Sequence, residues 1–105
     1  MNLDSKIYIA GHTGLVGSSL IHELRLQGYV NIITKTVYDL DLRNQAAVHT
    51  FFEQERPDFV FLAAAKVGGI HANMTFRADF IYDNLMIEAN IIHAAHVNEV
   101  KKLLF

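Results

Sequence analysis

Apolar residues gather in four short runs along the 105-residue chain, and more polar stretches separate them. The runs at 7–10, 31–34 and 59–65 predict buried strands, and the run at 101–105 predicts the start of a fourth strand. The third run, Phe-Val-Phe-Leu-Ala-Ala-Ala, shows no alternation of apolar and polar residues. Such a run is typical of a strand covered on both faces, so we expect a parallel sheet.

Helical periodicity fills the intervals between these strands. A helix of about fourteen residues should follow the first strand and end at Gly28 in the αL conformation. A second helix should begin after Asn44, a candidate N-cap, and stop at 55–58, which contains Pro57. The residues expected to face the core are Leu15, Ser19, Leu20, Leu24 and Leu26 in the first helix and Val48, Phe51 and Phe52 in the second.

A third, longer helix is predicted from about Asp79 to Asn98. It carries two apolar stripes that lie roughly 120° apart around the helix axis. One stripe can cover the sheet, whereas the other needs a further partner, because a helix that is apolar on most sides is buried on most sides. We expect this partner to be a second copy in a homodimer through the 79–98 helix, or a later part of the chain. The stripes are Ile81, Leu85 and Ile92, and Phe80, Ile87 and Ile91.

The alternation of strands and helices predicts an α/β fold with a partial, Rossmann-type doubly wound parallel sheet. Right-handed crossovers and a glycine turn after the first strand indicate the strand order 3-2-1-4. A ligand should then bind at the carboxyl ends of strands one and four, where the order reverses. Residues 1–105 should form one domain, because the chain has no repeat and no linker and contains a single proline.

Three glycines spaced three residues apart follow the first strand. Gly11 permits a tight turn, Gly14 lets the backbone approach a phosphate, and Gly17 lets the new helix pack closely on the sheet. The first N–H groups of that helix lack internal partners and carry partial positive charge, so a pyrophosphate suits this position. The spacing differs from the Gly-x-Gly-x-x-Gly of ordinary dehydrogenases, and a glycine turn without a ligand is the alternative.

Composition narrows the class of protein further. Hydrophobic residues make up 51% and charged residues 19% of the chain, which is typical of a globular protein. With a formal net charge of −2, neither nucleic acid nor an anionic membrane is expected as the main partner. The chain has no cysteine, so it has no disulfide and no thiolate metal site. It has no signal-peptide core and no apolar run long enough for a membrane span, and we expect a cytoplasmic protein.

Four stretches of the sequence, at 11–17, 61–73, 78–87 and 90–96, closely resemble the GDP-L-fucose synthase family. The block at 61–73 is the most specific, since the glycine motif is shared by the whole extended short-chain dehydrogenase/reductase superfamily. The resemblance covers essentially the whole chain and about the amino-terminal third of the family's length. It implies an NADPH-dependent 3,5-epimerase/4-reductase that acts on a nucleotide sugar, GDP-4-keto-6-deoxymannose.

The resemblance also implies which residues bind the cofactor. The glycine turn would hold the pyrophosphate, the Asp-Leu pair after the second strand would lie by the adenine, and the end of the third strand would back the ribose. Val67 to Gly69 would approach the substrate. The implied cofactor-binding residues are Gly11, His12, Thr13, Gly14, Leu15, Val16, Gly17, Asp41, Leu42, Ala63, Ala64 and Ala65.

Lys35 is added to this set for its charge. Bacterial members of the family often carry arginines for the 2′-phosphate of NADP, where this chain has Thr13 and Val37. Lys35 remains near the end of the second strand, where an NAD-preferring fold would usually place Asp or Glu. We therefore expect NADP, with NAD as the alternative. A merely solvated lysine is the other interpretation of Lys35.

The catalytic groups of the family have no counterpart in these residues. The chemistry needs a Ser, a Tyr-x-x-x-Lys pair and a proton-donating His and Cys, and none of the four tyrosines has a lysine four residues on. Residues 1–105 are therefore expected to be the amino-terminal part of an NAD(P)-binding Rossmann domain, without the substrate domain and inactive alone. A non-catalytic dinucleotide-binding or dimerising module is the alternative.

Several other polar residues remain open to two interpretations. His93 and His96 lie three residues apart on a predicted helix, and surface or interface histidines are favoured over a metal site there. Lys66, His71 and Asn73 follow the third strand, where each either faces the ligand or serves an ordinary loop.

Overall fold

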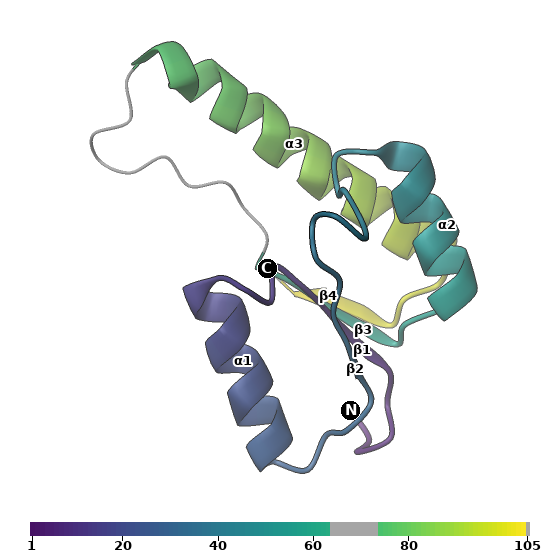
Figure 1. The fold of residues 1–105 in the computed structure, drawn as a ribbon. Helices are drawn as coiled ribbons and strands as arrows, with labels where there is room; N and C mark the ends of the chain where they lie inside the picture. The colour runs from purple at the N-terminus through teal and green to yellow at the C-terminus, as the bar shows by residue number, and fades with distance from the viewer. Residues whose placement is uncertain (64–73, 105) are drawn as a thin grey trace.

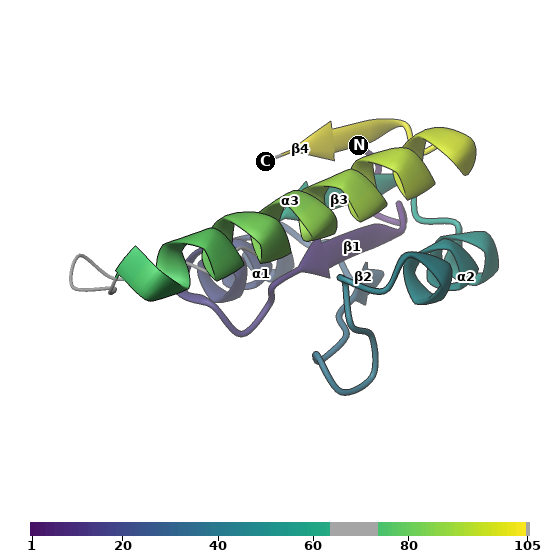
Figure 2. The same ribbon diagram turned by 90° about the horizontal axis from the view of Figure 1, so that it is seen from above.

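The computed structural model describes residues 1–63 and 74–104, and over 74–80 the helix backbone alone. One sheet of four parallel strands has the order β2-β1-β3-β4. Helix α1 lies on one face of the sheet, and α2 and α3 lie on the other (Figures 1 and 2). The elements are β1 (Ile7–Ala10), α1 (Leu15–Leu26), β2 (Ile32–Ile33), α2 (Gln45–Glu55), β3 (Phe59–Leu62), α3 (Met74–Val97) and β4 (Lys102–Leu104).

The side chains of β1 alternate between two hydrophobic cores. Ile7 and Ile9 pack with Ile21 and Leu24 of α1. Tyr8 and Ala10 face the opposite side, where they belong to the cluster formed with α2 and α3. Every residue of β1 is buried, which is why this strand has no polar position facing solvent. The predicted α/β fold with a doubly wound parallel sheet is confirmed.

The predicted strand order, 3-2-1-4, is wrong. β1 lies between β2 and β3, and it pairs with β3 along four residues from Ile7 to Ala10. β2 is only two residues long and half-buried, so it forms the edge, whereas the apolar β3 takes a central position with neighbours on both sides. The order therefore reverses between β1 and β3, and the expected ligand site between strands one and four moves to that point.

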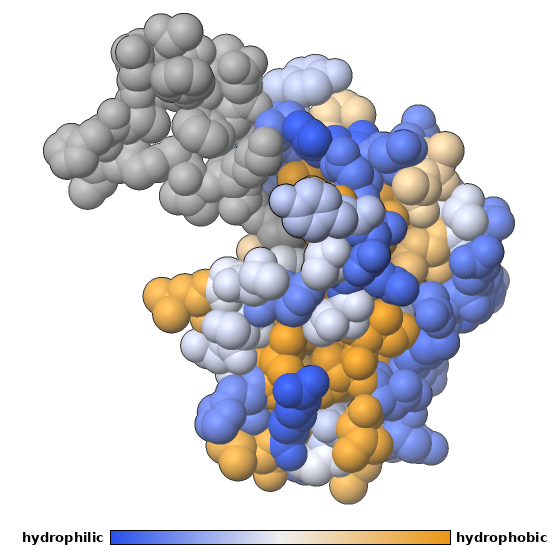
Figure 3. All heavy atoms as spheres, viewed as in Figure 1, coloured by the Kyte–Doolittle hydropathy of each residue, from blue (hydrophilic) through white to orange (hydrophobic). Residues whose placement is uncertain are grey.

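The ends of several elements also differ from the predictions. In α1 the buried residues are Gly17, Ile21 and Leu24, while Leu15 is 85% exposed and Leu26 69% exposed. Figure 3 shows hydrophobic atoms on the surface at both ends of α1. The second helix agrees with the prediction, since the Asn44 side chain caps it by accepting from the Ala47 N–H at 3.1 Å. β3 ends at Leu62 rather than at residue 65.

Helix α3 begins at Met74, before the predicted start, and presents two different faces. Ile87 and Ile91 are buried in the core with α2 and the sheet. Ile81, Leu85 and Ile92 are 55%, 60% and 43% exposed, so the described residues leave this predicted stripe uncovered. Over the described residues, no helix is long and apolar enough to cross a membrane.

Tyr8 gives the fold an expected dependence on alkaline pH. Its side chain is 1% exposed, and its ring centroid lies 4.6 Å from that of Phe51. Burial raises the pKa of Tyr8 well above its usual value, so the folded state keeps a proton that the unfolded state releases above about pH 10. The free energy of unfolding should then fall by up to about 1.4 kcal/mol per pH unit above that point.

Urea denaturation between pH 8 and 11 measures this dependence, with Tyr8→Phe compared with the wild type. The variant should lose less stability at high pH. Tyr38→Phe is the matched control, because Tyr38 is 96% exposed in the fold. Parallel curves for the wild type and Tyr8→Phe would contradict the prediction.

Candidate functional site

A cleft of about 560 Å³ opens at the carboxyl ends of the central strands. The glycine turn after β1, the segment at 35–43 after β2, Ala63 after β3 and Ile87 of α3 line it. The predicted site residues found there are Gly11, His12, Thr13, Gly14, Lys35, Asp41, Leu42 and Ala63. Val37, which the sequence analysis places where family members often carry an arginine, lines the cleft too. The lining residues that sequence reasoning missed are Thr36, Tyr38, Leu40, Arg43 and Ile87.

The remaining predicted residues divide into two groups. Leu15, Val16 and Gly17 belong to the first turn of α1 and do not line the cleft; Val16 is 70% exposed and Gly17 is buried. Ala64, Ala65, Lys66, Val67 to Gly69, His71 and Asn73 lie outside the described residues.

The glycine turn is constrained by its own backbone. Gly11 has φ 88°, which a residue with a side chain rarely adopts. A Cβ atom on Gly17 would lie 2.0 Å from the carbonyl oxygen of Gly11, so only glycine fits there. A Cβ on Gly14 would lie 3.6 Å from the same oxygen, which is an ordinary contact. Gly11 and Gly17 are therefore required by the fold, whereas the fold would accept a side chain at Gly14.

The start of α1 is suited to an anion. Gly14 is the N-cap and contributes no side-chain hydrogen bond, and the first turn contains no acidic residue. The N–H groups of that turn have no acceptors within the helix, and the helix dipole adds partial positive charge. Together with the cleft that Gly14 lines, these groups form a cradle for a phosphate or diphosphate.

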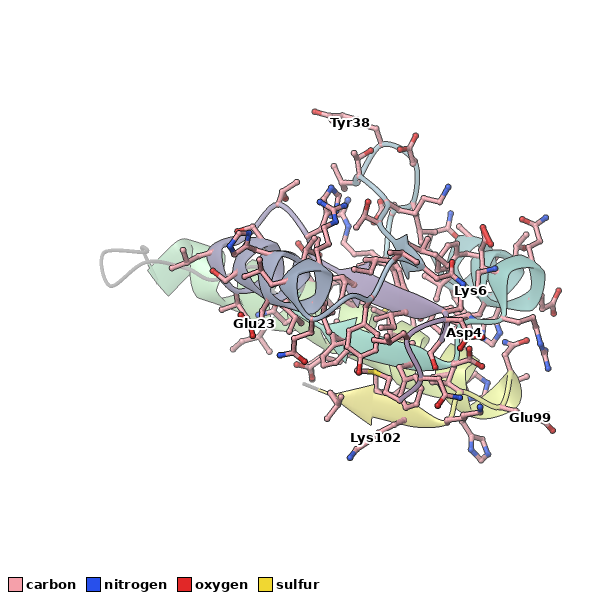
Figure 4. All side chains as sticks on the ribbon, turned by 90° about the horizontal axis from the view of Figure 1, so that it is seen from below. Asp4, Lys6, Glu23, Tyr38, Glu99 and Lys102 are labelled. Atoms are coloured by element: carbon pink, nitrogen blue, oxygen red, sulfur yellow. The ribbon has the colours of Figure 1, made fainter. Side chains whose placement is uncertain are left out.

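The segment after β2 is built from turns. Leu40 donates its N–H to the Thr36 carbonyl at 2.9 Å, and the Leu40 side chain is buried. The Tyr38 side chain extends away from the body of the protein, at the rim of the cleft (Figure 4). The segment connects the two-residue strand β2 to the Asn44 cap and forms no strand of its own. It forms one wall of the cleft.

Two cations among the described residues line the cleft, and their surroundings differ. Arg43 donates to both carboxylate oxygens of Asp41 at 3.1 Å and lies 3.6 Å from Asp83. The hydrogen bond to Asp41 raises the pKa of the Arg43 guanidinium further. Lys35 is exposed and forms no ion pair within residues 1–63 and 74–104. Of these two cations, Lys35 can therefore bind a phosphate without first breaking a salt bridge.

The histidines of α3 lie away from this cleft. The His93 ring contacts the His49 ring of α2, with centroids 5.2 Å apart. Over the described ranges, no group of three or more potential ligands could hold a metal ion.

Comparison with known proteins gives consistent matches. The NAD dependent epimerase/dehydratase family model matches residues 7–105. GDP-L-fucose synthase 1 of Arabidopsis thaliana is 57% identical over 101 residues, which are 96% of this chain and 31% of that protein. The GDP-L-fucose synthase of Escherichia coli (strain K12) is 57% identical over 100 residues, 95% of this chain and 31% of that protein. The chain thus spans 31% of the length of these two relatives.

Solved structures agree with these matches. MlghC, a GDP-mannoheptose C4 reductase from Campylobacter jejuni with NADP bound, is 51% identical with a TM-score of 0.94. The match covers 98% of this chain and 32% of that chain. The resemblance inferred from the motifs is confirmed.

Proposed function

The chain belongs to the NAD dependent epimerase/dehydratase family, and we propose that it is the cofactor-binding part of an NADPH-dependent enzyme that makes GDP-L-fucose. The proposed substrate is GDP-4-keto-6-deoxymannose, which the whole enzyme would epimerise and reduce. The observation that carries the proposal is the cleft between the glycine turn and the segment at 35–43. The 57% identity to two GDP-L-fucose synthases supports the choice of reaction.

Each part of the cleft has a role in this proposal. The amides at the start of α1 hold the diphosphate of the dinucleotide, and Lys35 binds its 2′-phosphate. Asp41, Leu42 and Ala63 line the cleft. In the proposal, Asp41 and Leu42 lie beside the adenine, and Ala63 backs the ribose. When bound, NADPH supplies the hydride that reduces the keto carbon.

The proposal assigns no catalytic residue to residues 1–105. Proton transfer to a carbonyl requires a positioned acid, and the Tyr-x-x-x-Lys pair and the cysteine of the family have no counterpart here. We therefore propose that this chain binds the cofactor and does not turn over alone.

Two measurements test the proposed function. Calorimetry of the 105-residue chain with NADP and with NAD should show binding, tighter for NADP. An NADPH-oxidation assay with GDP-4-keto-6-deoxymannose should show no turnover by the chain alone. Absence of heat with both dinucleotides would overturn the cofactor site, and clear turnover would overturn the division of roles.

Two alternative functions each have one observation in their support. The similarity to MlghC favours a GDP-linked heptose as the substrate, which a comparison of both sugars in the complete enzyme would decide. The exposed stripe of α3 favours a non-catalytic dimerising module, which would bind NADP weakly or not at all.

We also propose that α3 pairs two copies of the chain. Ile81, Leu85 and Ile92 form an exposed apolar stripe next to Tyr82, which is 64% exposed. Leu85→Lys should shift the chain from dimer toward monomer in sedimentation equilibrium, because a buried lysine at the interface costs desolvation energy. Leu26→Lys is the matched control, since Leu26 is 69% exposed on α1. A wild-type monomer at high concentration would contradict this proposal.

A further inference from the structure

One wall of the cleft is held from outside by α3. The segment at 40–43 belongs to no strand or helix, and α3 passes beside it (Figure 1). Asn90 of α3 donates from its side-chain Nδ2 to the carbonyl oxygen of Leu42 at 2.9 Å. Leu42 itself lines the cleft. The backbone position of this wall therefore depends on a contact between residues 48 positions apart in the chain.

Asn90 is an unusual residue for its position. It is 5% exposed and lies on α3 between Ile87 and Ile91, which are both buried in the core. A buried amide costs free energy unless its polar atoms are hydrogen-bonded, and an apolar residue there would avoid that cost. The hydrogen bond to the Leu42 carbonyl gives the Asn90 amide a partner and also links the cleft wall to α3.

A second contact of α3 reaches the same wall. Asp83 lies 3.6 Å from the guanidinium of Arg43, and the Asp83 side chain is 16% exposed. Asp83 and Asn90 are about two helical turns apart, so they lie on the same face of α3. Ile87 lies between them and lines the cleft directly. This face of α3 thus contacts both the cleft and the residues that form its wall.

We propose that Asn90 is a positioning residue for the dinucleotide site. It fixes the carbonyl of Leu42, and with it Asp41 and Leu42, at the separation from the glycine turn that the bound cofactor requires. Asp83 supports the same wall through Arg43. The proposal rests on the proposed function, since it concerns the same cleft.

Calorimetric titration of the 105-residue chain with NADP tests the proposal in two Asn90 variants. Asn90→Ala removes the donor, and Asn90→Asp keeps the size but places an oxygen against the Leu42 carbonyl. We expect the Kd for NADP to rise about tenfold in Asn90→Ala and further in Asn90→Asp. Amide hydrogen exchange at 40–43 should become faster in both variants.

Asn98 provides the matched control. It is also a buried asparagine, 4% exposed, but its side chain bonds to Ala94 and Arg56 and does not line the cleft. Asn98→Ala should lower the melting temperature and leave the Kd for NADP unchanged. Titrations are made at a temperature at which circular dichroism shows each variant folded. Equal Kd values for the wild type, Asn90→Ala and Asn98→Ala would overturn the proposal.

A milder variant keeps the test decisive if the Asn90 variants do not fold. Asp83→Asn keeps the shape of the side chain and removes its charge, and it should raise the Kd for NADP about threefold. An unchanged Kd in that variant would overturn the proposal. Absence of NADP binding by the wild type would refute the cofactor site. Wild-type binding that the variants leave unchanged would refute the role of α3 and leave the cofactor site intact.

Discussion

Gly17→Ala is expected to have the largest effect of any single substitution in the glycine turn. The new Cβ would lie 2.0 Å from the Gly11 carbonyl oxygen and 2.8 Å from its carbon, both backbone atoms. Relief requires α1 to move away from the turn, so the free energy of unfolding should fall by about 3 kcal/mol or more. Urea denaturation followed by circular dichroism measures this loss. NADP binding should disappear, because the displaced helix no longer presents its amides to the diphosphate.

Gly14→Ala separates stability from binding. Its Cβ would lie 3.6 Å from the nearest protein atom, and Gly14 has φ −75°, which alanine adopts readily. The stability should change by less than about 1 kcal/mol. If a diphosphate lies against this backbone, the added methyl should raise the Kd for NADP at least tenfold. A stable Gly17→Ala variant, or undiminished NADP binding by Gly14→Ala, would contradict this description of the turn.

The second large effect is expected at Lys35. Within the described part of the chain, Lys35 lines the cleft and forms no ion pair, whereas Arg43 is paired with Asp41 and Asp83. A hydrogen bond between charged groups contributes about 1.5–3 kcal/mol, so Lys35→Ala should raise the Kd for NADP by about tenfold to a hundredfold. The Kd for NAD should change little, because NAD lacks the 2′-phosphate. Titration calorimetry with both dinucleotides gives the two values.

Lys102→Ala is the charge-matched control for Lys35. Lys102 is exposed on β4, away from the cleft (Figure 4), and its loss changes the net charge by the same amount. Equal weakening by both variants would show a general charge effect. An unchanged Kd for NADP in Lys35→Ala would favour the interpretation of Lys35 as a solvated lysine.

Local sequence signals predicted local structure well. The αL conformation at Gly28, with φ 96°, and the Asn44 cap each depend on a few consecutive residues. The required absence of a side chain at Gly17 was expected from the motif, although the clash is with the glycine turn itself rather than with the sheet. Periodicity also separated the buried stripe of α3, with Ile87 and Ile91, from an exposed one.

The errors concern contacts between distant segments. Strand order depends on which strand has the length and the two apolar faces to lie centrally, and the two-residue β2 loses that place to β3. Leu15 is exposed at the first residue of α1, and periodicity alone does not show which residues at a helix end are covered. Arg43 was not predicted to line the cleft, although its position directly after Asp41 and Leu42 could have indicated it.

The sequence by itself determined the elements, the glycine turn and the family, because each is encoded in neighbouring residues whose conformational preferences act over a few positions. Only the tertiary structure decided the strand order, the pairing of Arg43 with Asp41 and Asp83, and the bond from Asn90 to Leu42. These contacts depend on how whole helices pack on the sheet. That packing is set by the combined burial of many side chains, so no short stretch of the chain encodes it.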